Sequence, residues 1–127
     1  DNIFLISPTT PEPRMQKIVE RARGFIYCVA VKGVTGSGEL DIDEVARSVA
    51  LIREKTALPI AVGFGIKNAA SASAVAACAD AVVVGSALIA EMQQTAHSAE
   101  GIEEIQIHGA AVELLRSIRA GVDSSPS

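Results

Sequence analysis

The chain has 127 residues, of which 49% are hydrophobic and 20% are charged, so it is long and apolar enough to form one globular domain with a core. Its net charge is −4 and its 11 Lys and Arg residues are dispersed, which argues against nucleic acid or an anionic membrane as a partner. The sequence contains neither a run of about 20 apolar residues nor a signal-peptide pattern, so we expect a cytoplasmic protein without a membrane span.

Four short apolar runs predict the strands of a parallel sheet. Each run is rich in Val, Ile or Phe and has little polar alternation, as expected of strands buried on both faces. The runs are residues 3–7 (IFLIS), 25–31 (FIYCVAV), 59–63 (PIAVG) and 80–85 (DAVVVG). The first and last runs are as apolar as the middle two, so the sequence shows no protection of either sheet edge.

The segments between the runs predict helices. The first helix covers residues 11–22, with Thr10 as its N-cap, Pro11 at its first position and Gly24 just beyond its end. The second begins after Asp41, which is followed three residues later by a glutamate, as in a capping box. The apolar stripe of this second helix consists of Val45, Val49 and Ile52.

Three more helical segments lie toward the C-terminus. A helix rich in Ala and Ser begins at Asn68 and ends near Cys78, a short helix covers residues 86–91, and a long amphipathic helix covers residues 102–119. A polar link joins the last two helices. We expect the polar residues 122–127 to form a flexible tail.

Strand and helix alternate four times, which predicts an α/β fold with parallel strands and right-handed crossovers. Two architectures fit this order: a small open sheet, or four βα units of a (β/α)8 TIM barrel, whose other half would cover the unprotected edges. The apolar outer strands favour the half-barrel. We therefore expect the last four βα units of such a barrel over residues 1–121, followed by the tail over residues 122–127.

A polar or glycine-rich segment follows each predicted strand. These segments are residues 7–10 (SPTT), 32–40 (KGVTGSGEL), 63–68 (GFGIKN) and 85–88 (GSAL). Because the C-terminal ends of parallel strands face one way, all four segments open onto the face where ligands bind. The last two each lead into a helix start and leave backbone N–H groups free, which favours a shared phosphate site over two plain tight turns.

Four motifs stand in a fixed order along the chain: PTTPEPR (8–14), RGFIYCVAVKGVTG (23–36), LPIAVGFGI (58–66) and ADAVVVGSALI (79–89). Together they resemble the C-terminal half of the tryptophan synthase alpha chain family. The resemblance implies a TIM-barrel lyase that, as an intact chain, cleaves indole-3-glycerol phosphate to indole and glyceraldehyde 3-phosphate. It also implies a complex with a beta chain that carries pyridoxal phosphate, while this chain itself has no cofactor.

The resemblance assigns roles to individual residues. Tyr27 and Phe64 match positions at the indole pocket, and Thr35 matches the threonine of a mobile loop that closes over substrate. The positions that match phosphate-binding residues are Gly36, Gly65, Gly85 and Ser86. The family's two catalytic carboxylates lie in the N-terminal half, which nothing here matches. We therefore predict no catalytic residue in this chain, and an inactive isolated chain.

Other reactive side chains have simpler interpretations. Cys28 and Cys78 lack metal-site or redox spacing and are interpreted as small buried hydrophobes, so no metal site is predicted. His97 and His108 are interpreted as surface residues, and Lys67 either approaches phosphate or faces solvent. The acidic residues interpreted as capping or solvated, and not catalytic, are Glu39, Asp41, Asp43 and Glu44.

The leading hypothesis is a C-terminal fragment of the alpha chain, which the start at Asp1, directly before an apolar strand, also favours. A second hypothesis is a phosphate-binding module without lyase activity, two copies of which pair their open edges into a full barrel. A third is another phosphate-binding barrel, such as an isomerase or epimerase of sugar phosphates.

Overall fold

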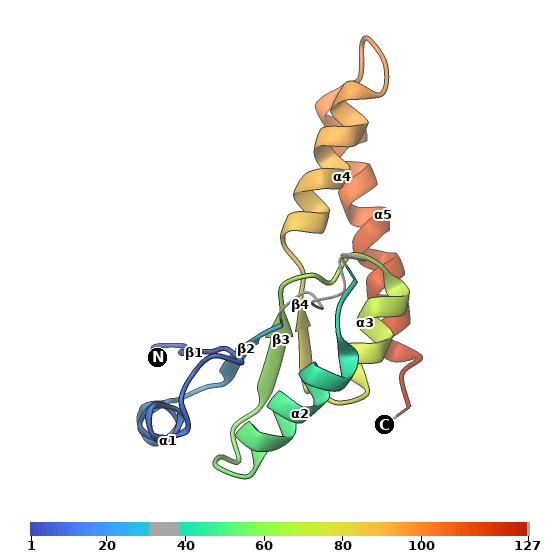
Figure 1. The fold of residues 1–127 in the computed structure, drawn as a ribbon. Coiled ribbons are helices and arrows are strands. Elements are labelled where there is room, and N and C mark those ends of the chain that lie inside the picture. The colour runs from blue at the N-terminus through green and yellow to red at the C-terminus, as the bar shows by residue number, and fades with distance from the viewer. Residues whose placement is uncertain (31–38, 127) are drawn as a thin grey trace.

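The computed structural model describes residues 1–30 and 39–126 and shows a parallel four-stranded sheet with helices packed against it (Figure 1). The strands are β1 (Leu5–Ile6), β2 (Ile26–Val29), β3 (Ile60–Gly63) and β4 (Ala81–Val83). They lie in the order β1-β2-β3-β4, with Gly63 of β3 opposite Val83 of β4. The four predicted strands are confirmed, each shorter than its apolar run, and β1 and β4 form the edges of the sheet.

Among the described residues, five helices follow the strands. They are α1 (Glu12–Arg21), α2 (Ile42–Arg53), α3 (Ala69–Ala76), α4 (Ser86–His97) and α5 (Glu104–Asp123). α5 packs against α3 near its C-terminal end and against α4 near its N-terminal end. Figure 1 shows that α4 and the first half of α5 project together beyond the sheet.

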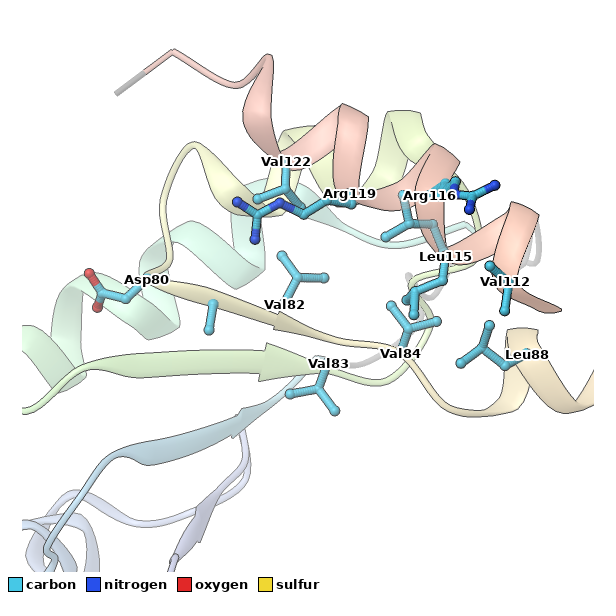
Figure 2. A pocket seen from close by; sticks show the side chains of 12 residues that line it. Asp80, Val82, Val83, Val84, Leu88, Val112, Leu115, Arg116, Arg119 and Val122 are labelled. Atoms are coloured by element: carbon cyan, nitrogen blue, oxygen red, sulfur yellow. The ribbon is translucent and has the colours of Figure 1, made fainter. Parts of the chain in front are cut away.

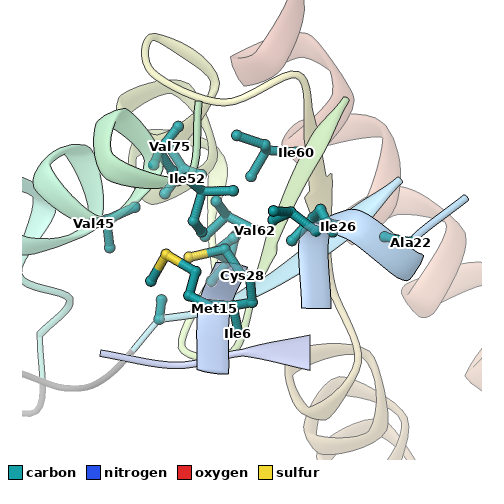
Figure 3. Packing of buried hydrophobic residues seen from close by; sticks show 14 of the residues in the cluster. Ile6, Met15, Ala22, Ile26, Cys28, Val45, Ile52, Ile60, Val62 and Val75 are labelled. Atoms are coloured by element: carbon teal, nitrogen blue, oxygen red, sulfur yellow. The ribbon is translucent and has the colours of Figure 1, made fainter. Parts of the chain in front are cut away.

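The hydrophobic core lies between the sheet and its helices (Figure 3). Alternate residues of the strands, such as Cys28 and Val62, point toward the helices, as the period of two in a strand requires. Met15 from α1, Ile52 from α2 and Val75 from α3 meet them there. The core thus fixes the strands from one side and leaves their C-terminal ends free to carry loops.

The opposite face of the sheet is open. Leu5 and Val83 alternate with core-facing residues along β1 and β4, so their side chains lie on the face away from the core. They are 61% and 36% exposed. Parallel sheets are normally covered on both faces, and among the described residues no helix covers this one.

Side-chain caps fix the starts of α2 and α3: the cap at Asp41 was predicted, whereas at Asn68 only the start of the helix was. The Asp41 carboxylate accepts a hydrogen bond from the Glu44 backbone N–H at 3.0 Å. At α3, the Asn68 side chain accepts from the Ser71 N–H at 2.9 Å, and the Ser71 hydroxyl accepts from the Asn68 N–H at 3.3 Å. These bonds satisfy amide groups that a helix start otherwise leaves without partners.

The predicted N-cap of the first helix is wrong. Pro11, and not Thr10, occupies the N-cap position, and it makes no side-chain cap bond. A cap at Thr10 would place Pro13 at the third helical position, and proline has no N–H to donate to the cap. The Thr10 hydroxyl instead accepts a hydrogen bond from the Ser7 N–H at 3.1 Å, within the turn after β1.

The two C-terminal helices are longer than predicted. α4 continues from Ser86 to His97 through the predicted polar link, because Ala, Met and Gln favour helix and no Gly or Pro intervenes before Gly101. α5 reaches Asp123, and Val122 packs against the core, although the sequence placed both residues in the tail. The flexibility of the tail stays a prediction. Over the described ranges, none of the helices combines the length and apolarity that crossing a membrane requires.

Candidate functional site

A cavity of about 170 Å³ lies at the C-terminal ends of β2, β3 and β4. The residues that line it are Tyr27, Phe64, Gly65, Ile66, Val83, Gly85 and Ser86. Five of these are predicted site residues, far apart in the sequence, and the parallel sheet brings them to one place. The other two predicted residues, Thr35 and Gly36, lie outside the described residues.

The backbone at the centre of the site has a left-handed conformation at two successive residues. Phe64 has φ of 80° and Gly65 has φ of 84°. Glycine adopts this region without penalty, but a phenylalanine there is strained. The Phe64 side chain is also 60% exposed, so its ring gains little from burial in the core. Strain of this kind is typically retained where it positions a functional group.

The hydroxyl end of Tyr27 occupies the space beside Gly63, a contact that the sequence prediction missed. A Cβ atom added to Gly63 would overlap the Tyr27 hydroxyl and would lie 3.1 Å from the Cβ of Val83. Gly63 therefore makes room for the tyrosine ring at the floor of the cavity. The signal in the sequence was Gly63, which we interpreted as the end of a strand and the start of a glycine loop.

The N-terminus of α4 forms the polar side of the cavity. Gly85 is the N-cap residue and makes no side-chain cap bond, and a Cβ added to it would meet no atom within 4 Å. The first amide groups of a helix have no partner within that helix and lie at its positive dipole end. Together with the Ser86 hydroxyl, they can hold an anion. No carboxylate is among the residues that line the cavity.

A second cavity, of about 260 Å³, lies on the other side of Gly65. Lys67 and Asn68 line it together with Leu40 of the segment before α2. Lys67 is therefore not among the lining residues of the smaller cavity. The Lys67 side chain is exposed.

The histidines and acidic residues are distributed over the surface. His97 Nδ1 lies 2.6 Å from the Gln93 carbonyl oxygen of its own helix, and His108 Nε2 lies 3.7 Å from Glu104 Oε1. Neither histidine lines the cavity, and Asp41 is engaged in its cap.

Burial raises the pKa of both thiol groups. Burial raises the pKa of the Cys28 thiol to about 11, and the nearby Cys78 thiol adds to this shift. Burial likewise raises the pKa of the Cys78 thiol. A reactive cysteine needs a lowered pKa. The interpretation as a buried hydrophobe fits Cys28, whereas Cys78 is only half-buried and packs at the border of the core.

A larger groove, of about 780 Å³, runs along β4 and α5 (Figure 2). Its walls are aliphatic, from residues such as Val82, Val84 and Leu115, and its polar groups lie at the rim. Val83 also lines the groove, although Figure 2 shows its side chain on the opposite side of β4 from Val82. Most of the groove lies between β4 and α5, whereas the candidate site lies at the strand ends, and Val83 borders both.

Known proteins are similar to this chain in both sequence and fold. The family model described as the tryptophan synthase alpha chain matches residues 1–116. The tryptophan synthase alpha chain of Thiobacillus denitrificans is 52% identical over 126 residues, which cover 98% of this chain and 43% of that relative. The corresponding chain of Chromobacterium violaceum is 56% identical over 93 residues, 73% of this chain and 36% of that relative.

Solved structures give the same result. The tryptophan synthase alpha chain from Legionella pneumophila subsp. pneumophila superposes with a TM-score of 0.76 at 33% identity, covering 98% of this chain and 43% of that chain. Tryptophan synthase from M. tuberculosis in its aminoacrylate-bound form superposes with a TM-score of 0.72 at 26% identity, covering 94% of this chain and 39% of that chain.

The chain spans about two fifths of the length of the curated relatives that it matches. Its four parallel strands cover a similar share of the solved alpha chains, so the fold is half of a (β/α)8 TIM barrel. The family model, the sequence identity and the superposition all agree over nearly the whole chain. The chain belongs to the tryptophan synthase alpha chain family.

Proposed function

We propose that this chain supplies the phosphate-binding and indole-binding half of the active site of a tryptophan synthase alpha subunit. In the intact subunit, this site cleaves indole-3-glycerol phosphate to indole and glyceraldehyde 3-phosphate. The observation that carries the proposal is the cavity at the strand ends, where Tyr27, Phe64, Gly65, Gly85 and Ser86 meet.

The polar side of the cavity suits a phosphate group. Gly65 and Gly85 present backbone without a side chain, so a ligand oxygen can approach their N–H groups closely. Ser86 adds a hydroxyl donor at the first position of α4. The positive end of the α4 dipole and the absence of carboxylates from the lining both favour a dianion. Gly36, from the loop after β2, is the proposed fourth contact.

The apolar side of the cavity suits an indole ring. Tyr27 and Phe64 supply aromatic rings and Val83 supplies an aliphatic wall. Flat aromatic ligands gain from such contacts through burial and ring-to-ring packing. Thr35 is proposed to lie on the mobile loop that closes over the bound substrate.

Cleavage of the substrate also requires an acid and a base. One group must protonate the ring carbon and another must accept the proton of the glycerol hydroxyl. The residues that line the described cavity include no carboxylic acid and no histidine. The proposed catalytic carboxylates therefore come from the other half of the barrel, and this chain alone binds ligand without turning it over.

The proposal extends to the partner and the compartment. The intact alpha subunit works in a complex with a beta chain that carries pyridoxal phosphate and receives the indole. This chain holds no cofactor of its own. The proposed location is the cytoplasm.

Calorimetric titration tests the proposal on a joined chain, in which this sequence follows the N-terminal part of the Thiobacillus denitrificans relative that it does not match. We expect indole-3-propanol phosphate to bind at least about tenfold more tightly than ribulose 5-phosphate, and indole-3-glycerol phosphate to be cleaved. Tighter binding of the sugar phosphate would support an isomerase or epimerase instead.

A serine pair provides a matched control for the phosphate site. Ser86→Ala removes a hydroxyl that lines the cavity, so we expect the dissociation constant of indole-3-propanol phosphate to rise about tenfold. Ser73→Ala, on α3 and outside the lining of the cavity, should leave the dissociation constant unchanged. If the two substitutions raised the dissociation constant equally, Ser86 would not be a phosphate contact.

A further inference from the structure

The loop between β3 and α3 carries Gly65, whose backbone N–H is a proposed phosphate contact. A glycine backbone can adopt many conformations, so the direction of this N–H group depends on what holds the residues around it. Gly65 lies in the left-handed region, at φ of 84°. The next residue, Ile66, is buried in the core. The contacts of the residues that follow Ile66 therefore also bear on Gly65.

Ser71 ties this part of the loop to α3. Its hydroxyl oxygen accepts hydrogen bonds from the Lys67 N–H at 3.2 Å and from the Asn68 N–H at 3.3 Å. The hydroxyl also lies 2.9 Å from the Asn68 side-chain oxygen, to which it can donate. Residues 67–71 thus form one closed turn, which is joined to Gly65 through Ile66 alone.

Gly121 of α5 supports the same turn from the neighbouring helix. Gly121 is buried, and a Cβ atom added to it would overlap the carbonyl oxygen of Ala69 and would lie 2.9 Å from the Ala69 Cα. Ala69 is the first residue of α3 and belongs to the turn. Glycine is less favourable than alanine inside a helix, and here it allows the two helix backbones to meet. The start of α3 therefore rests directly on α5.

Neither Ser71 nor Gly121 lines the candidate cavity. We propose that both are positioning residues, which hold the turn over residues 67–71 and thereby keep the Gly65 N–H in the orientation that binds phosphate. A donor that is held in place before the ligand arrives gives tighter binding, because less conformational entropy is lost on binding. This inference rests on the phosphate site proposed above.

Calorimetric titration of the joined chain tests the role of Ser71. Ser71→Ala removes the acceptor of two backbone N–H groups, so we expect the dissociation constant of indole-3-propanol phosphate to rise about fivefold. The dissociation constant of indole, which has no phosphate, should rise less than about twofold. A loss of stability alone would not distinguish the two ligands. Ser71→Thr keeps the hydroxyl and should restore the affinity.

Ser73→Ala is the matched control for Ser71→Ala. Ser73 lies on the same helix and lines neither the candidate cavity nor the second cavity beside Gly65. Both dissociation constants should be unchanged in this variant. If Ser71→Ala raised the two dissociation constants by the same factor, or if Ser73→Ala had the effect expected of Ser71→Ala, the proposal would be overturned.

Gly121→Ala tests the second contact, because the added methyl group displaces the start of α3. We expect the same difference between the two ligands as for Ser71→Ala. Gly109→Ala is its control: Gly109 lies on the same helix, and a Cβ added there would meet no atom within 4 Å. If Gly121→Ala does not fold, the Ser71 variants decide the proposal.

Amide NMR without ligand separates this proposal from the proposed function. In the ¹⁵N-labelled joined chain, Ser71→Ala and Gly121→Ala should shift the Gly65 amide signal, whereas the two controls should not. An unchanged Gly65 signal in the Ser71 and Gly121 variants would overturn the positioning role. If the joined chain without substitutions bound neither ligand, the proposed function would be contradicted, and the Gly65 signal would still test the positioning.

Discussion

Phe64 and Gly65 share a left-handed backbone, but only one of them is a glycine. A residue with a Cβ atom costs about 1–2 kcal/mol in this region. The exposed Phe64 ring returns little of that cost through burial. We infer that the strained conformation is retained because it places the Phe64 ring beside the cavity, which a glycine at this position could not supply.

Substitutions at these two positions should have opposite effects on stability. Phe64→Gly relieves the strain and should raise the free energy of unfolding by about 0.5–1 kcal/mol, after the entropy cost of a new glycine. Gly65→Ala should lower it by about 1–2 kcal/mol, since its Cβ would lie 3.3 Å from Leu40 Cδ1 at φ of 84°. Urea unfolding measures both changes in the free energy of unfolding. If the two substitutions changed it in the same direction, the left-handed backbone at Phe64 and Gly65 would be contradicted.

The contact between Tyr27 and Gly63 predicts that substitutions at these two positions have coupled effects on stability. Gly63→Ala should lower the free energy of unfolding by about 2 kcal/mol, because the new methyl group overlaps the tyrosine hydroxyl. In a Tyr27→Ala background the same change should cost much less. A double-mutant cycle by urea unfolding should give a coupling energy of at least about 1 kcal/mol, and additive effects would rule the contact out.

The buried Cys28 thiol predicts a loss of stability at alkaline pH. Its pKa is raised from 9.0 to about 11 in the folded chain, so the unfolded chain releases its proton first as pH rises. The contribution of this thiol to the free energy of unfolding is therefore fully present below about pH 9. It decreases toward pH 11, by on the order of 2 kcal/mol. Cys28→Ala should remove this slope from the unfolding free energy measured between pH 8 and 11. If Cys28→Ala kept the same pH dependence of the unfolding free energy, that dependence would come from other groups.

At the scale of elements, the cap of α3 positions the loop that carries Phe64 and Gly65. Asn68 caps α3 directly after the GFGIK segment, and its bonds with Ser71 fix where that loop ends. A displaced helix start would move Gly65 and Phe64 with it.

Removal of the α3 cap should be measurable. Asn68→Ala should lower the free energy of unfolding by about 1 kcal/mol, because the Ser71 N–H loses its acceptor. Asn68→Ser keeps an acceptor oxygen and should restore most of that loss. Thermal unfolding distinguishes the two, and equal stability of the variants would mean that the cap contributes nothing.

The type and order of the elements were predictable from the sequence, because their signals are local. The apolar runs, the Asp41 cap and the Asn68 cap each depend on a few neighbouring residues. The N-cap of α1 was mistaken because the effect of Pro13 on amide donors outweighs the preference for Thr10. The length of α4 was underestimated because its polar residues were read as a link, although they favour helix.

The site was predictable only in part. The glycine loops after β3 and β4 follow from strand polarity, and the structure brings Gly65, Gly85 and Ser86 to one cavity. The contact of Tyr27 with Gly63 depends on how two strands align and on a ring that reaches across them. Such a contact has no local signal in a single sequence. The roles of the cavity residues toward substrate stay predictions.

At the scale of the whole molecule, the half-barrel explains both the cavity and the open edges. The four βα units present one group of loops at the strand ends, while β1, β4 and one sheet face remain uncovered. The loops lie at the ends of the strands, where we propose that ligand binds, and the open edges lie along the sides of β1 and β4.

The central claim is that the cavity at the strand ends holds the phosphate and indole groups of the substrate. Amide NMR of the joined chain, labelled with ¹⁵N and titrated with indole-3-propanol phosphate, tests it directly. We predict that the amide signals of Gly65, Gly85 and Ser86 shift together along one binding curve. Unchanged signals at these three residues, with shifts confined to other parts of the chain, would contradict the claim.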